Sequence, residues 1–216
     1  MKVFAINGSP RKNWNTSIVL NKALEGVRKV YPYVQTEIIH LYDMRYTGCV
    51  SCFSCKRLNS HSYGRCVLKD DLTELLNEIS FADGIILGSP IYFGDVTGAF
   101  HSFVERFCFQ YYSYDRNNCS IAPKRMPISI IYTMNLSESM LEQCGYLNTI
   151  KPLEQILGRV FMMVESLYVC NTFQFDDYSQ YKCENFSVTE KTEYRKQHFP
   201  IDCQRAFELG ERLISI

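Results

Sequence analysis

The amino-terminal stretch 2–17 constrains the fold of this chain more than any other part of the sequence. It begins with the apolar run Val-Phe-Ala-Ile at 3–6, which is short and rich in strand-forming residues, as in a buried β-strand. The turn sequence Asn-Gly-Ser-Pro at 7–10 ends that strand. The sequence Asn-Thr-Ser at 15–17 then offers three possible helix caps before the periodic apolar positions of 18–27. The stretch therefore predicts a strand, a short polar loop and a helix.

The loop between this strand and this helix has the chemistry of an anion site. Backbone N–H groups and the dipole at a helix N-terminus attract negative charge. The hydroxyls of Ser9, Thr16 and Ser17, with Arg11 beside them, suit the oxygens of one phosphate. The loop lacks the later glycines of a dinucleotide fingerprint and the Gly-Lys-Ser/Thr of a P-loop. Because ligands of open α/β sheets bind outside the carboxyl ends of strands, we predict a monophosphate site rather than an ordinary turn.

The rest of the chain repeats the alternation of strand and helix. Further strands are predicted at 34–41, 84–88, 127–134 and within 164–175. Helices are predicted at 18–30, 72–79, 96–107, 147–157 and 203–213, with a start of another near residue 138. Five strands alternating with helices predict a three-layer, doubly wound parallel α/β sheet in one domain spanning 1–216. Periodicity fails at about 43–69, and a loop of this length is usually functional.

The charge and the apolar runs exclude several kinds of partner. The formal net charge is zero and no basic block is present, so neither nucleic acid nor an anionic membrane is expected as the main partner. No apolar run approaches the roughly 18 residues that span a bilayer, and the amino terminus lacks a signal-peptide pattern. We therefore expect a cytoplasmic protein, in which most of the ten cysteines are reduced thiols.

Four of these cysteines lie in the long loop at 43–69. Cys49, Cys52 and Cys55 form a Cys-x-x-Cys-x-x-Cys triplet, and Cys66 follows after ten residues. This compact triplet with a fourth thiolate is typical of a [4Fe–4S] cluster, whereas zinc more often uses two separated Cys-x-x-Cys pairs. Free thiols or a disulfide remain open alternatives. Because parallel strands end at the same edge of a sheet, we expect this loop to lie beside the phosphate loop.

A further cysteine pattern points to a different chemistry. The sequence at 119–125 matches the Cys-x5-Arg loop of low-molecular-weight tyrosine phosphatases. That loop must precede a helix, so that free N–H groups face the phosphate. Here it precedes a predicted strand and contains a proline, so we reject the phosphatase reading. The remaining cysteines lack ligand spacing and are expected to be small, largely buried hydrophobes.

Three loops are predicted to meet at the carboxyl edge of the sheet, namely 9–17, 90–94 and 133–135. The second carries Tyr92 and Phe93 with a flexible backbone at Gly94, which suits contact with a flat ring. The alternative is that the two aromatic side chains simply cover the end of the sheet. A monophosphate site beside a platform for a flat ring describes a site for flavin mononucleotide (FMN).

At these motifs the chain resembles the flavodoxin-fold NAD(P)H-dependent FMN reductases, and within them the iron–sulfur flavoproteins. The resemblance rests on Gly-Ser-Pro-Arg-Lys at 8–12 with Asn-Thr-Ser at 15–17, on the segment 88–98 and on the cysteine loop. It implies a five-stranded flavodoxin-like sheet of order 2-1-3-4-5, bound FMN, NAD(P)H as co-substrate and a homodimer or homotetramer. Trp14 departs from the family pattern, in which a small residue is more usual.

The resemblance also assigns residues to the cofactors. The FMN phosphate is expected on Ser9, Arg11, Asn15, Thr16 and Ser17. The isoalloxazine ring is expected against Pro90, Ile91, Tyr92, Phe93, Gly94, Thr133, Met134 and Asn135. The cluster ligands would be Cys49, Cys52, Cys55 and Cys66.

The favoured function is that of an oxidoreductase that takes electrons from a nicotinamide nucleotide and passes them to an acceptor that the sequence does not identify. No side chain is nominated as catalytic, because the flavin supplies the chemistry. An alternative is an electron-transfer protein without NAD(P)H oxidase activity of its own, and a third is a flavin-binding sensor whose thiols respond to oxidants. We expect Trp14, Tyr111, Tyr112 and Tyr114 to be partly buried between subunits.

Overall fold

The computed structural model describes residues 1–116 and 120–214 of the chain. The strands are β1 (Lys2–Asn7), β2 (Gln35–His40), β3 (Gly84–Tyr92), β4 (Asp95–Val96), β5 (Pro127–Thr133) and β6 (Met162–Val169). The helices are α1 (Asn15–Val30), α2 (Leu72–Ile79), α3 (Gly98–Phe109), α4 (Glu138–Gln143), α5 (Tyr146–Val160), α6 (Val188–Gln197) and α7 (Phe199–Arg212). Short 3-10 helices are η1 (Leu41–Asp43), η2 (Ser54–Lys56) and η3 (Tyr178–Gln180).

The strands form one sheet of order β2-β1-β3-β5-β6, in which every neighbouring pair is parallel. The two-residue strand β4 pairs with β3 in the antiparallel direction. The expected count of five strands is therefore corrected to six, although the parallel strands taken alone follow the order 2-1-3-4-5. The sequence prediction missed β4 because Phe93 and Gly94, with φ of 54° and 87°, turn the chain back tightly within what was read as a loop.

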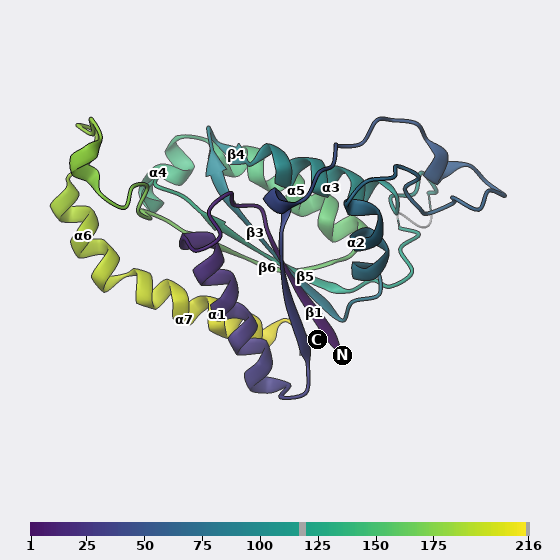
Figure 1. The fold of residues 1–216 in the computed structure, drawn as a ribbon, viewed down its shortest axis with the longest axis horizontal. Coiled ribbons are helices and arrows are strands. Elements are labelled where there is room, and N and C mark those ends of the chain that lie inside the picture. Colours follow the sequence, from purple (N-terminus) through teal and green to yellow (C-terminus); the bar gives the residue numbers. More distant parts are fainter. Residues whose placement is uncertain (117–119, 215–216) are drawn as a thin grey trace.

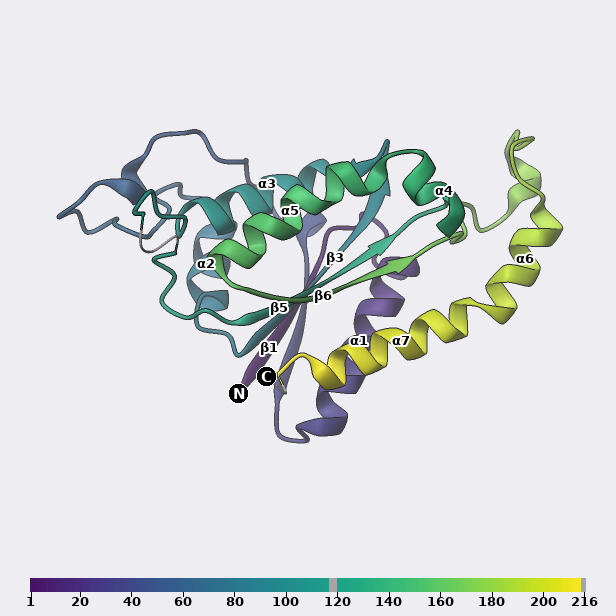
Figure 2. The same cartoon turned by 180° about the vertical axis from the view of Figure 1, so that it is seen from behind.

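Helices cover both faces of the sheet, which makes the fold a three-layer, flavodoxin-like α/β arrangement (Figures 1 and 2). Side chains of β1 alternate between the faces. Phe4 and Ile6 lie in a core with buried side chains of α2, α3 and α5. Val3 and Ala5 lie in a second core with those of α1 and α7. The run of fully buried residues in β1 is thus explained by a strand that has helices on both sides.

The two helices on the second face approach each other at glycine positions. A Cβ atom at Gly26 of α1 would lie 1.9 Å from the carbonyl O of Phe207, and one at Gly210 of α7 would lie 1.9 Å from that of Ala23. The backbones can therefore meet only because both positions lack a side chain.

The carboxy-terminal helices differ from the sequence prediction. α7 begins four residues before the expected start at 203, and α6 was not predicted, because its mainly polar sequence has almost no apolar periodicity. None of the helices in the described part of the chain is both long and apolar enough to cross a membrane.

Candidate functional site

A pocket of about 500 Å³ opens at the carboxyl edge of the sheet, which is a volume typical of cofactor sites. Its walls come from the segments that follow β1, β3, β5 and β6. Among its lining residues are Ser9, Arg11, Asn15, Thr16, Pro90, Ile91, Tyr92, Phe93, Thr133, Met134 and Asn135. These are all of the residues that we predicted to bind a cofactor, with the exception of Ser17 and Gly94. The three predicted loops do converge.

The two exceptions have specific reasons. Ser17 is buried within the first turn of α1 rather than in the loop. Gly94 forms the β3–β4 turn, where its Cβ position would lie 3.3 Å from the ring of Tyr146. The start of α1 also differs from the prediction, because Trp14 takes the N-cap position and provides no side-chain cap within the described structure. Asn15 and Thr16 are therefore the first helical residues and not caps.

Short hydrogen bonds fix the loops that form the floor of the pocket. The backbone N–H of Gly8 donates to the carbonyl O of Gly88 over 2.7 Å. The hydroxyl of Thr97 donates to the carbonyl O of Gly8 over 2.7 Å. The hydroxyls of Thr16 and Thr133 lie 2.7 Å apart and are buried, which joins the start of α1 to the end of β5. These hydrogen bonds therefore hold the floor of the pocket in a fixed position.

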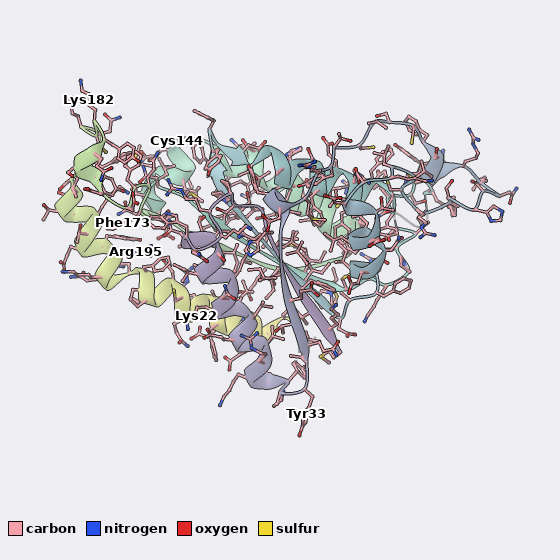
Figure 3. All side chains as sticks on the ribbon, in the orientation of Figure 1. Lys22, Tyr33, Cys144, Phe173, Lys182 and Arg195 are labelled. Atoms are coloured by element: carbon pink, nitrogen blue, oxygen red, sulfur yellow. The ribbon has the colours of Figure 1, made fainter. Side chains whose placement is uncertain are left out.

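The segment after β6 crosses the phosphate loop and occupies several of its polar side chains. Trp14 Nε1 and Asn15 Nδ2 both donate to the carbonyl O of Phe173, over 3.1 and 2.8 Å. Arg11 Nη1 donates to the carbonyl O of Gln174 over 2.6 Å. Arg195 of α6 donates to Asn15 Oδ1 and lies close to Phe173, as Figure 3 shows. A phosphate in this loop would therefore replace backbone carbonyls as the acceptor of Arg11 and Asn15.

Sequence reasoning missed this segment because it placed the last strand only somewhere within 164–175, whereas β6 ends at Val169. The signal that it overlooked is Asn171, whose φ of 51° breaks the extended conformation that the aromatic sequence favours. The pocket residues that were missed as ligand contacts are Leu136, Tyr146, Thr172, Phe173, Gln174, Phe175 and Phe186. Trp14, noted only as a departure from the family pattern, also lines the pocket.

The opposite wall of the pocket suits a flat, partly polar ring. The side chain of Phe93 is fully exposed, and that of Tyr92 is 46% exposed. Partial burial raises the pKa of Tyr92 above its ordinary value, so its hydroxyl is neutral at pH 7. Asn135 Oδ1 is buried and has no hydrogen-bond partner among the described residues. An unpartnered acceptor beside exposed aromatic rings fits the ring N–H and the faces of a flavin.

The four loop cysteines line a second, much smaller cavity of about 20 Å³. Arg106, Phe109 and Gln110 from the carboxy-terminal end of α3 complete its walls. Burial raises the pKa of the Cys55 thiol; Lys56 opposes that shift, and the thiols of Cys66, Cys49 and Cys52 reinforce it. Hydrogen bonds from Ser54 lower the pKa of Cys52. The other three thiols therefore lie close enough to Cys55 to disfavour its thiolate, as side chains around one cavity do.

The predicted metal centre is nevertheless not formed as a coordination group. Within residues 1–116 and 120–214, no set of three or more His, Cys, Asp or Glu side chains is arranged to hold a metal ion. A cavity of about 20 Å³ has room for about one water molecule, so a cluster would have to move the thiols apart.

The chemistry and backbone of this loop do fit an iron–sulfur cluster. Four thiols are the ligand set of such a cluster. Ser51 and Phe53, on either side of Cys52, have φ of 52° and 55°, a strained conformation that clusters at functional sites. Gly64, two residues before Cys66, has φ of 70°, which allows a tight turn there.

The expectation that the cysteines lie beside the flavin pocket is wrong within one chain. The long loop does begin at that edge, where Lys12 Nζ lies 2.6 Å from Asp43 Oδ1. It then follows α3 to the opposite end of the sheet, and Figures 1 and 2 both show it on the far side of the molecule from α6. Glu105 accepts a hydrogen bond from Cys49 N over 3.0 Å, and Lys56 Nζ donates to the carbonyl O of Phe109. These contacts set the direction of the loop.

Among the described residues, the other cysteines do not form a metal-binding group. Cys108 and Cys170 are buried, as expected, whereas Cys144 is exposed. Cys119, the first residue of the rejected phosphatase-like pattern, lies outside the described residues. The arginine of that pattern, Arg125, donates to the carbonyl O of Phe161 over 2.8 Å.

A parallel sheet with a nucleotide-sized pocket at its carboxyl edge defines a flavodoxin-like protein of the flavin-binding class. Residues 1–123, more than half of the chain, match the family of NADPH-dependent FMN reductases. The chain therefore belongs to the NADPH-dependent FMN reductase family, as its motifs predicted.

Among curated proteins the chain is similar to iron–sulfur flavoproteins. It is 39% identical over 106 residues to one from Methanocaldococcus jannaschii, a match that covers 49% of this chain and 51% of the relative. It is 40% identical over 106 residues to one from Archaeoglobus fulgidus, which covers 49% and 48%. The matches thus span about half the length of these relatives.

Solved structures share the fold over nearly the whole chain. An NAD(P)H:quinone oxidoreductase from Methanothermobacter marburgensis superposes with a TM-score of 0.69 and 17% identity over 99% of this chain and 98% of its own. An azoreductase from Bacillus anthracis superposes with a TM-score of 0.69 and 11% identity over 98% and 99%. At these identities the similarity shows the fold alone.

Proposed function

We propose that residues 1–216 act as one domain that binds FMN in the pocket at the carboxyl edge and oxidises NADH or NADPH. The observation that carries this proposal is the convergence of the predicted loops on one pocket of about 500 Å³. Family membership supports the same cofactor. Bound FMN supplies the chemistry, namely the acceptance of a hydride and its release as electrons.

The chain's own residues hold and orient the cofactor. Arg11 and Asn15 donate to the phosphate at the start of α1, where the helix dipole also favours an anion. Tyr92 and Phe93 would provide the aromatic contact for the isoalloxazine, and Asn135 Oδ1 would offer it a hydrogen-bond acceptor. Because no side chain has to transfer a proton, no acid–base residue is assigned.

We further propose that Cys49, Cys52, Cys55 and Cys66 hold a [4Fe–4S] cluster, for which the shared cavity is the support. The iron–sulfur flavoproteins that the chain resembles in sequence favour the same assignment. The second candidate function, electron transfer between flavin, cluster and a protein partner without NAD(P)H oxidation, depends on this site. The final electron acceptor is a small molecule or a protein that accepts electrons from either centre.

One experiment separates these functions. The full chain is purified without oxygen, and its absorption spectrum, flavin content and iron content are measured. Oxidation of NADH and NADPH is then followed with excess FMN. Flavin bands with steady nicotinamide oxidation support the reductase, whereas both chromophores without nicotinamide oxidation support the electron-transfer protein. Absence of bound flavin after incubation with FMN would refute both.

We also propose that the active form is a homodimer or homotetramer. A groove of about 580 Å³ lies over α3 and α5 and includes Tyr112, Tyr114 and Cys49. Tyr111 is excluded from such an interface, because it is buried in the core against Phe107 and Phe161. Light scattering should report a multiple of 25.2 kDa at micromolar concentration, and a monomer would end this proposal.

A further inference from the structure

Three buried N–H donors in the wall of the cysteine cavity make no hydrogen bond to an oxygen or nitrogen within the described part of the chain, and the Arg106 side chain already interacts with the thiol of Cys66. They are Nε and Nη2 of Arg106 and Nε2 of Gln110. The Arg106 side chain is completely buried, and Gln110 is only 3% exposed. Both residues line the cavity together with the four cysteines. Arg106 lies in the last turn of α3, and Gln110, four positions later, is the C-cap residue and keeps the helical conformation, so both side chains lie on the same face.

Each of these side chains is anchored by its remaining polar atoms. Arg106 Nη1 is paired with Asp70 and also donates to the carbonyl O of Thr47 over 3.3 Å. Gln110 Oε1 accepts from the backbone N–H of Cys66 over 3.0 Å. The unpartnered donors therefore belong to side chains that are already fixed in position, and not to side chains that lack any interaction.

Leaving such donors unpaired is costly. A buried polar group without a partner destabilises the folded state, and more so when it is charged. Folded proteins keep these groups when a ligand, an ion or a water completes them. The missing partner must accept hydrogen bonds and suits a negative charge, because two of the three donors belong to a guanidinium and Lys56 adds a second cation beside Cys55. Thiolate and sulfide sulfurs at the centre of the four cysteines have both properties.

We propose that Arg106 and Gln110 are positioning residues that donate N–H···S hydrogen bonds to the cluster held by the four cysteines. This inference rests on the cluster assignment made above. Reduction adds one negative charge to the cluster, so hydrogen-bond donors and a neighbouring cation stabilise the reduced form more than the oxidised form. Removal of these donors should therefore make the cluster harder to reduce.

The test compares the cluster potential of four proteins, each loaded without oxygen as the full chain. These are the wild type, Arg106→Lys, Gln110→Leu and the control Arg65→Lys. Lysine at 106 keeps the positive charge that faces Asp70 but removes the guanidinium donors, so it is the variant most compatible with folding. Arg65 is next to Cys66 in the sequence, but it is exposed, its Nε donates to Asn77 and it does not line the cavity. The potential is read from the electron paramagnetic resonance of the reduced cluster during titration with dithionite.

We expect Arg106→Lys and Gln110→Leu each to shift the one-electron equilibrium about tenfold towards the oxidised form, which corresponds to about 59 mV. Arg65→Lys should leave it unchanged. Equal potentials in all four proteins would overturn the inference while leaving the cluster assignment intact. A wild-type protein that binds no iron would overturn the cluster assignment and this inference with it. Circular dichroism and bound flavin report folding in each case, and Gln110→Leu decides the question if Arg106→Lys does not fold.

Discussion

Arg11 Nη1 and the carbonyl O of Gln174 lie 2.6 Å apart, although the two residues are 163 positions apart in the chain. This hydrogen bond joins the loop after β1 to the segment after β6 at the edge of the pocket. The guanidinium is therefore held where a phosphate would bind, before any ligand arrives. Binding would exchange a neutral carbonyl acceptor for a charged one, which is a favourable change.

Arg11→Ala should weaken FMN binding by about 1.5–3 kcal/mol, the usual contribution of a hydrogen bond to a charged group. That is roughly a 10- to 150-fold rise in Kd, measured by quenching of FMN fluorescence on titration. Arg28→Ala is the matched control, because Arg28 lies in the last turn of the same helix and donates to Thr36. An unchanged Kd for Arg11→Ala would remove this residue from the site.

The single tryptophan should report flavin binding directly. Trp14 lines the pocket, and it is the only tryptophan in the chain. Since flavins absorb at the wavelengths at which tryptophan emits, saturation with FMN should quench most of the protein emission. Trp14→Phe should abolish this signal while FMN still binds. Emission that stays constant through saturation with FMN would place the flavin elsewhere.

Loss of one thiol should separate the two proposed cofactors. In Cys52→Ser the cluster absorption should disappear, because a hydroxyl is a poor ligand for iron, while bound FMN remains at the wild-type ratio. Cys144→Ser is the control, since Cys144 is exposed and does not line the cysteine cavity. A Cys52→Ser protein with the full wild-type spectrum would contradict the assignment of Cys52 as a ligand.

The close contact between α1 and α7 should be sensitive to a single methyl group. Gly210→Ala places a carbon 1.9 Å from the carbonyl O of Ala23, so the helices must separate. We expect the free energy of unfolding to fall by about 1–3 kcal/mol or more. Gly158→Ala in α5 meets only Met163 Cβ at 3.4 Å and should be neutral or stabilising by up to about 1 kcal/mol. Equal urea midpoints for the two variants would contradict this account of the packing.

Asp83 should make the free energy of unfolding depend on pH in the acid range. Burial disfavours its charge, but Lys124 Nζ at 2.6 Å and the backbone N–H of Lys2 at 2.7 Å outweigh this effect and lower its pKa below 3.8. A carboxyl with a lowered pKa in the folded state stabilises the protein fully above its ordinary value, and loses that contribution as the pH falls through the folded-state pKa.

Asp83→Asn should therefore cost about 0.5–1 kcal/mol of unfolding free energy at pH 7, since the ion pair is partly exposed. The difference from wild type should shrink towards zero as the pH is lowered below 3.8. Urea unfolding of both proteins at pH 7 and at acid pH measures this. A difference that is equal at both pH values would show that the charge of Asp83 is not its cause.

The flavin pocket was largely predictable because its residues follow from strand order. Once β1, β3 and β5 are recognised as parallel neighbours, the loops after them must meet at one edge, and Ser9, Phe93 and Asn135 indeed share a pocket. The fourth wall was not predictable in the same way. Phe173 and Phe175 have the sequence character of a strand, and only the contacts of Trp14 and Asn15 with the Phe173 carbonyl show that the chain has left the sheet.

The cysteine loop marks the limit of topological reasoning. Strand order fixes where the loop begins, next to Lys12, but nothing in local periodicity fixes where more than twenty residues lead. Its direction depends on single long-range contacts, such as Glu105 with Cys49 and Lys56 with the end of α3. Such contacts can be recognised only in three dimensions. The four cysteines line one small cavity, but its distance from the pocket at the carboxyl edge was not foreseen.

The length of α3 has a consequence for the path of electrons. The helix has 12 residues and thus spans about 18 Å, with the flavin pocket near its start and the thiols near its end. Electron tunnelling slows exponentially with distance, so electron transfer between the proposed flavin and the proposed cluster of one chain would be slow. The thiol Cys49 also borders the open groove over α3 and α5, which lets a neighbouring copy approach it. Efficient electron transfer between the two proposed sites would then require two copies of the chain in contact. Dilution that separates the copies should therefore slow this transfer without unfolding any chain.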